Sequence, residues 1–134
     1  MKVVILAGGM GTRISEYTKT LPKPMIKICG KPIIHRIIDH YIKHGYKEFI
    51  IAIGFKGNVI KKYFSQTKIN KNIKIQLVNK GLKTMTGGRL KRLKKLLNET
   101  FLMTYGDGLS SVNILKLVNF HKSQKKLFTL TAVR

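Results

Sequence analysis

Lys2-Val-Val-Ile-Leu-Ala-Gly-Gly-Met-Gly-Thr-Arg13 decides the fold, because it combines one hydrophobic strand with a glycine-rich, cationic turn. The apolar residues Val3 to Leu6 follow one another without a polar residue between them. A continuous run of this kind is typical of a strand that is buried on both faces of an α/β sheet. We therefore expect an α/β fold with a mostly parallel sheet.

The turn itself is suited to an anion. Gly8, Gly9 and Gly11 permit positive φ angles and let a ligand approach the backbone. Thr12 and Arg13 add a hydroxyl and a fork of charged donors. The turn matches neither the dinucleotide fingerprint nor the P-loop pattern, so a simple connection between strand and helix stays open as an alternative. Its place after the first buried strand favours a phosphate site.

Length and composition indicate one packed domain. The 134 residues are 43% hydrophobic and include no apolar run of the roughly 18 residues that a membrane span needs. The single cysteine, Cys29, excludes an internal disulfide and is compatible with a reducing compartment. We expect a cytoplasmic protein that does not interact with membranes.

The charge is strongly positive, with 27 Lys and Arg against 5 Asp and Glu, for a net charge of +22. Such a charge attracts nucleic acid or phosphorylated small molecules. The lysines are spread over the whole chain, however, and aromatic residues do not interleave with them as a stacking surface would require. We interpret most of them as solvent-facing residues, with a basic module for nucleic acid or another anionic partner as the alternative.

Strand-like and helix-like segments alternate along the rest of the chain. Strands are predicted at 3–6, 48–53, 73–77, 100–105 and 127–133, with a short β-like piece at 25–28. Helices are predicted from Pro32 to Gly45, at 59–64, from Leu90 to Leu97, and from Ser110 or Ser111 to Gln124. In the last helix the residues expected to be buried are Ile114, Leu115, Leu117 and Val118.

Two charged residues outside the first turn are candidates for phosphate chemistry. Lys23 lies between two prolines, which restrict the backbone and hold the cation on a stiff segment. Asp107 lies between two glycines at the end of a predicted strand, where a carboxylate can meet Mg²⁺ bound to phosphates. His35, His40 and His44 have no metal-ligand spacing and are interpreted as structural.

Four segments, in this order and spacing, resemble the sugar-phosphate nucleotidyltransferases, most closely the glucose-1-phosphate cytidylyltransferases. They are Leu6-Ala-Gly-Gly-Met-Gly-Thr-Arg13, Leu21-Pro-Lys-Pro-Met25, Met85-Thr-Gly-Gly-Arg-Leu-Lys-Arg92 and Tyr105-Gly-Asp-Gly108. The third is the most discriminating and indicates the cytidylyl branch. The resemblance runs from Met1 to Arg134 and covers the amino-terminal half of a typical member. It implies a Rossmann-like three-layer α/β/α fold that is truncated: residues 1–134 form the nucleotide-binding part, without the sugar-binding part.

The reaction that the resemblance implies is CTP plus α-D-glucose 1-phosphate to CDP-glucose and pyrophosphate, by in-line attack on the α-phosphorus. Arg13, Lys23 and Asp107 would be catalytic, and Asp107 would bind the Mg²⁺ cofactor. The nucleotide would be bound by a set taken from all four segments, with the Thr86 to Arg89 stretch at the cytidine end. The set comprises Leu6, Ala7, Gly8, Gly9, Met10, Gly11, Thr12, Arg13, Lys23, Thr86, Gly87, Gly88, Arg89 and Gly106.

The chain departs from the family pattern in two places. The segment between Phe64 and Ile73 is shorter than in the cytidylyltransferases, and the half that holds the sugar pocket and a second metal-binding aspartate does not occur. We therefore expect weakened CTP binding and little or no turnover by these 134 residues alone. An open sheet edge after the last predicted strand would favour a homo-oligomer or a companion chain.

Overall fold

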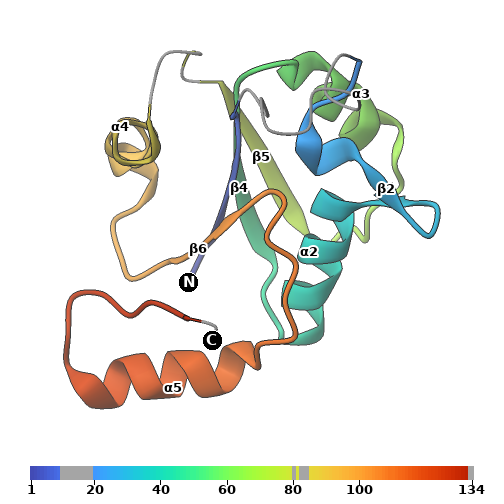
Figure 1. The fold of residues 1–134 in the computed structure, drawn as a ribbon. Helices are drawn as coiled ribbons and strands as arrows, with labels where there is room; N and C mark the ends of the chain where they lie inside the picture. The colour runs from blue at the N-terminus through green and yellow to red at the C-terminus, as the bar shows by residue number, and fades with distance from the viewer. Residues whose placement is uncertain (10–19, 80, 82–84, 133–134) are drawn as a thin grey trace.

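A parallel sheet forms the centre of the protein (Figure 1). The computed structural model describes residues 1–9, 20–79, 81 and 85–132. In this part of the chain the sheet has the order β5-β4-β1-β6. Its strands are β1 (Val3–Ala7), β4 (Glu48–Ile53), β5 (Lys74–Asn79) and β6 (Leu102–Tyr105). All three pairings are parallel, which confirms the predicted α/β class.

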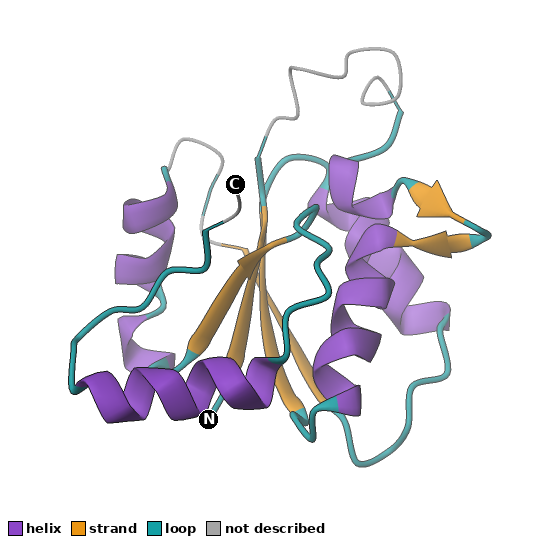
Figure 2. Ribbon diagram, turned by 60° about the horizontal axis from the view of Figure 1, so that its bottom comes forward, coloured by secondary structure: helices purple, strands orange, loops and turns teal. Residues whose placement is uncertain are grey.

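Helices cover both faces of the sheet, so the fold has three layers (Figure 2). One hydrophobic core lies between Val3, Ile5 and Ala7 of β1 and the helices α2 (Ile33–Lys43), α3 (Gly57–Gln66) and α5 (Ile114–Gln124). The opposite core lies between Val4 and Leu6 and the segment of α4 (Thr86–Arg92) and the 3-10 helix η2 (Lys94–Leu96). Every β1 side chain is buried in one core or the other, as the continuous apolar run predicts.

A small hairpin follows the proline segment. The 3-10 helix η1 (Lys23–Met25) leads into β2 (Lys27–Ile28), which pairs antiparallel with β3 (Lys31–Pro32). The two turn residues, Cys29 and Gly30, have φ angles of 47° and 77°. A two-residue turn with both φ angles positive matches the twist of paired strands. Of the predicted β-like piece at 25–28, Lys27–Ile28 forms one arm of this hairpin, whereas Met25 ends η1.

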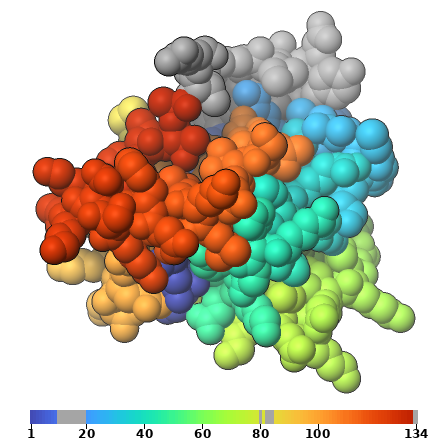
Figure 3. Space-filling model, turned by 90° about the horizontal axis from the view of Figure 1, so that it is seen from below, coloured from blue at the N-terminus to red at the C-terminus, as the bar shows by residue number. Residues whose placement is uncertain are grey.

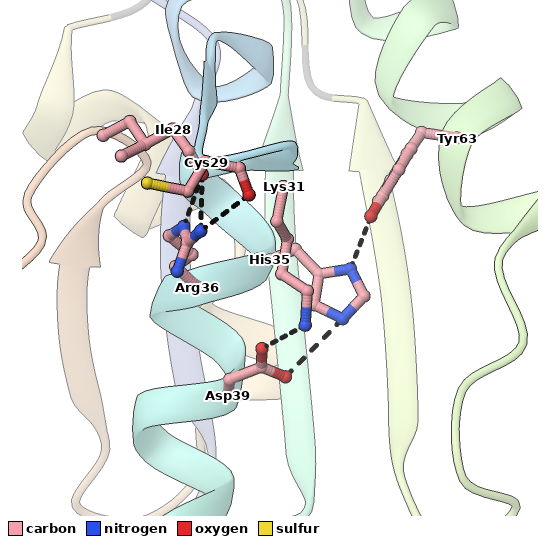
Figure 4. A network of polar contacts seen from close by, with 7 residues as sticks. All are labelled: Ile28, Cys29, Lys31, His35, Arg36, Asp39 and Tyr63. Atoms are coloured by element: carbon pink, nitrogen blue, oxygen red, sulfur yellow. Dashed lines mark hydrogen bonds and ion pairs between the residues drawn. The ribbon is translucent and has the colours of Figure 1, made fainter.

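The histidines of α2 make structural contacts. His35 Nδ1 lies 2.5 Å from the Tyr63 hydroxyl of α3, while its Nε2 faces Asp39 Oδ1 at 3.5 Å (Figure 4). Lys31 Nζ in turn donates to Asp39 Oδ2 at 2.7 Å, which ties the hairpin to the helix. No cluster of three metal-ligating side chains occurs among the described residues. These contacts agree with a structural role.

The carboxyl-terminal region differs most from the sequence-based expectations. The expected strand at 127–133 does not form over its described residues 127–132, where the chain lies along α5 (Figure 3) and Thr129 Oγ1 contacts His121 Nδ1 at 2.8 Å. β6 is half-buried rather than buried, because within the described part of the sheet it pairs only with β1.

The start of α5 also differs from the prediction. Asn113, not Ser110 or Ser111, caps the helix, since its side chain accepts a hydrogen bond from Lys116 N at 3.0 Å. Ile114 and Val118 are buried as predicted, but Leu117 is only half-buried and Leu115 is 53% exposed. No helix in the described part of the chain has the length and apolarity needed to cross a membrane.

Candidate functional site

Four chain segments meet at the carboxyl edge of the sheet. Gly8 follows β1, Gly54 follows β4, Asn79 ends β5, and Gly106 follows β6. The chain runs from β1 to β4 and β5 on one side and then crosses to β6 on the other side of β1. The crevice at such a reversal of strand order is the usual ligand site of open parallel sheets. The topology therefore places the first predicted motif at the expected binding edge.

The glycine turn is shaped by close approach and not by unusual backbone angles. Gly8 and Gly9 do not have the positive φ angles expected for them; among the described glycines these occur at Gly30, Gly45 and Gly81. A Cβ added to Gly8 would lie 1.4 Å from Arg89 Nη1, so glycine is needed to admit the guanidinium. A Cβ on Gly9 would meet none of the described residues within 4 Å, so this residue borders open space on the described side of the turn.

Arg89 contacts the turn from α4. Its Nη2 donates to the Gly8 carbonyl oxygen at 2.6 Å, and the residue is only 7% exposed. Burial lowers the pKa of the Arg89 guanidinium from its ordinary value, although arginine remains protonated at neutral pH. Leu93 lies one helical turn after Arg89 and is fully buried against the sheet. It therefore holds the face that carries Arg89 against the sheet. The structure thus joins the first and third predicted motifs directly.

Lys23 and Asp107 form the second contact between predicted site residues. Lys23 Nζ lies 3.7 Å from Asp107 Oδ2, and the two side chains are 22% and 45% exposed. Pro24 packs on Gly106, where an added Cβ would lie 2.7 Å from Pro24 Cγ and 3.2 Å from Ala7 Cβ. Gly106 N also donates to the Leu6 carbonyl oxygen at 2.9 Å. The absence of a side chain at Gly106 therefore lets the proline segment bring Lys23 to Asp107.

The remaining predicted site residues divide into three groups. Leu6 and Ala7 are buried in β1 and serve the sheet. Thr86, Gly87 and Gly88 form the first turn of α4 rather than a loop, and the two glycines are exposed. The last group lies outside the described residues and comprises Met10, Gly11, Thr12 and Arg13.

Sequence reasoning missed two residues at this edge. A Cβ on Gly54 would lie 2.8 Å from the Gly8 carbonyl oxygen and 3.2 Å from Arg89 Nη1, so Gly54 bounds the space that holds the guanidinium. Pro24 supports Gly106, as described above. Gly54 could have been found from its place directly after a buried strand, because carboxyl ends of parallel strands share one edge.

The carboxylate of Asp107 at this edge is compatible with Mg²⁺. Asp107 is partly exposed and is already balanced by a cation, Lys23. A single carboxylate suits Mg²⁺, which commonly takes one or two protein carboxylates together with phosphate oxygens and water. It would not suit a structural zinc ion, which needs four protein ligands.

Comparison with known proteins yields consistent relatives. A family model described as nucleotidyl transferase matches residues 2–134. The glucose-1-phosphate cytidylyltransferase of Salmonella typhimurium is 44% identical over 154 aligned positions, which cover 98% of this chain and 60% of that protein. A probable glucose-1-phosphate cytidylyltransferase of Bacillus subtilis is 38% identical, with 99% of this chain and 60% of that protein covered.

A solved structure agrees with these sequences. The crystal structure of HddC from Yersinia pseudotuberculosis complexed with GMP-PN has a TM-score of 0.78 and 28% identity, over 90% of this chain and 53% of HddC. The chain thus spans 60% of the length of the curated relatives cited above. The Salmonella alignment has 154 positions against 134 residues here, so the relative carries segments within the matched region that this chain lacks.

Proposed function

The chain belongs to the nucleotidyl transferase family, and we propose that it is the nucleotide-binding part of a glucose-1-phosphate cytidylyltransferase. The observation that carries the proposal is that the four motifs meet in two contacts at one sheet edge: Arg89 on Gly8, and Lys23 beside Asp107. The 44% identity to the Salmonella enzyme supports the choice of CTP and a sugar 1-phosphate, with glucose 1-phosphate as the preferred sugar.

The reaction class explains why the site contains cations and glycines. A phosphate oxygen of the sugar 1-phosphate attacks the α-phosphorus of CTP, the bond to the β-phosphate oxygen breaks, and pyrophosphate leaves. No protein nucleophile is required, so catalysis depends on positioning and on stabilisation of negative charge. Lys23 would stabilise the charge that builds on the α-phosphate. Arg13 would do the same for the pyrophosphate, and Gly8 to Gly11 would surround the phosphates.

Asp107 would hold Mg²⁺ together with the phosphate oxygens. Bound there, Mg²⁺ would neutralise phosphate charge and orient the triphosphate. Lys23 partly compensates the Asp107 carboxylate, which keeps both groups at the edge where the proposal needs them. The same proposal includes a companion segment that carries the sugar site, because the relatives are longer than this chain.

Nucleotide titration tests the proposal. We expect saturable CTP binding that is stronger with Mg²⁺ than without it, and we expect Asp107→Asn to remove the Mg²⁺-dependent part. Asp39→Asn is a matched control, because Asp39 also pairs with a lysine, Lys31, at 2.7 Å but lies in the hairpin and α2 network (Figure 4). Asp39→Asn should leave CTP binding unchanged.

Two results would contradict the proposal. One is the absence of CTP binding in the unaltered protein. The other is binding to polynucleotides of any base with a steep salt dependence, which would favour the basic-module alternative. Pyrophosphate release from CTP and glucose 1-phosphate, measured in parallel, reports whether these 134 residues alone perform turnover.

A further inference from the structure

Arg89 lies beneath the glycine turn, in a position where it can control the turn without touching a nucleotide base. Its guanidinium fills the space that a Gly8 side chain would take, and the residue is 7% exposed. We propose that Arg89 is a positioning residue for phosphate binding, which fixes the orientation of the Gly8–Gly9 peptide. The inference rests on the proposed function, but it replaces the expected role of Arg89 at the cytidine end.

The planar Gly8–Gly9 peptide links the carbonyl that Arg89 contacts to the N–H of Gly9. The Gly8 carbonyl oxygen accepts hydrogen bonds from Arg89 Nη2 at 2.6 Å and from Phe55 N at 3.5 Å. No cis peptide bond occurs among the described residues, so the N–H of Gly9 points to the side opposite this carbonyl. The carbonyl that Arg89 holds therefore sets the direction of the Gly9 N–H, which points away from the guanidinium.

The residues around the Arg89 guanidinium hold it in place. Gly54 also borders the guanidinium, since an added Cβ there would be 2.8 Å from the Gly8 oxygen and 3.2 Å from Arg89 Nη1. Two glycines from neighbouring strands therefore form a slot with room for a flat guanidinium. Burial of the charged donor strengthens its hydrogen bond to the carbonyl, because water competes less for the donor. The slot fixes both the arginine and the peptide that it holds.

A positioning role and a base-reading role predict different binding patterns. A residue that reads the base would change the preference among nucleotides, whereas a residue that orients the phosphate turn would change affinity for every ligand with a triphosphate. The probes are CTP, UTP and inorganic tripolyphosphate, each titrated into the unaltered chain and its variants.

We expect Arg89→Ala to weaken binding of all three ligands by a similar factor of about tenfold, the value of one charge-assisted hydrogen bond. Arg89→Lys keeps the positive charge but loses the forked N–H donors of the guanidinium, so it should also weaken the binding of all three ligands. Arg92→Ala removes the same charge from an exposed position on α4 and serves as the control. Gly8→Ala leaves Arg89 in place but displaces its guanidinium, so it should reproduce the loss even if Arg89→Ala proves too unstable to assay.

Each outcome is decisive. Equal losses for the three ligands, together with a shifted Gly9 amide resonance in Arg89→Lys, support the inference. Unchanged affinities, or a loss confined to CTP, overturn it while the proposed function stands. If the unaltered chain binds tripolyphosphate but not CTP, the proposed function fails and the inference is decided by tripolyphosphate alone. If it binds none of the three, both are overturned.

Discussion

Gly106→Ala is the sharpest test of how the site is assembled. The new Cβ would lie 2.7 Å from Pro24 Cγ, 3.1 Å from Pro24 Cβ and 3.2 Å from Ala7 Cβ. Ala7 belongs to the central strand and cannot move without disturbing both neighbouring strands. The proline segment is therefore the part that must shift, and it carries Lys23 away from Asp107.

The loss of stability expected for Gly106→Ala comes mainly from overpacking. Inserting a methyl group into a filled contact typically costs about 1–3 kcal/mol, and contacts on two sides favour about 2 kcal/mol here. The ion pair adds little to stability, because side chains that are 22% and 45% exposed are screened by water and such pairs contribute up to about 1 kcal/mol. A loss of 2 kcal/mol corresponds to a fall in Tm of about 8 °C for a domain of this size.

Gly108→Ala is the matched control. Its added Cβ would meet Thr104 Oγ1 and the Tyr105 oxygen at 3.6 Å, which is ordinary contact. Both substitutions restrict the unfolded chain equally and gain about 0.4–1 kcal/mol from this effect, so the difference between them isolates the contact with Pro24. The assay is thermal unfolding followed by circular dichroism, with CTP affinity measured on both variants. Equal Tm values, or a CTP affinity of Gly106→Ala equal to that of Gly108→Ala, would refute the reasoning.

Three further predictions concern the cap, the histidine network and the ion pair. Asn113→Ala should lower the free energy of unfolding by about 1 kcal/mol, as the loss of an N-cap does, whereas Ser111→Ala should leave it unchanged. Equal effects of the two substitutions in denaturant unfolding would contradict the assigned cap. Burial, partly opposed by Asp39, lowers the pKa of His35 from its ordinary value of 6.5. The folded state therefore disfavours the proton on His35, and stability should fall as pH decreases below about 6.5. His35→Gln should flatten this dependence in unfolding curves from pH 5 to 8, and an unchanged pH dependence in this variant would contradict the reasoning. Lys23→Gln should lower the free energy of unfolding by less than about 1 kcal/mol, yet it should weaken CTP binding severalfold. A large loss of stability, measured by urea unfolding, would show that Lys23 serves mainly the fold.

The sequence predicted the central sheet well, because its strands are marked by local patterns. The continuous apolar runs at Val3–Ala7 and Glu48–Ile53 correspond to strands that are buried between two layers. The short β-like piece at 25–28 contains one arm of a hairpin, whose second arm was not predicted because Lys31–Pro32 is only two residues long. The family and fold followed from four motifs, and both are confirmed.

What the sequence could not predict depends on contacts between distant residues. The 127–133 segment has a strand-like composition, but a strand also needs a neighbour to pair with, and residues 127–132 lie along α5 instead. The burial of Arg89 is equally nonlocal, since it depends on Gly8 and Gly54 from two other segments. The motif marked Arg89 as important, but it carried no information on which group the guanidinium contacts.

The position of β1 also has a consequence for biosynthesis. It precedes both of its partner strands in the chain: Val3 pairs with Phe49 on one side and with Leu102 on the other. Until residues 102–105 emerge, the most apolar strand of the sheet has one open edge, and such edges recruit other chains. We expect nascent chains that stall between β4 and β6 to be the species most dependent on chaperones, with completion of β6 ending that dependence.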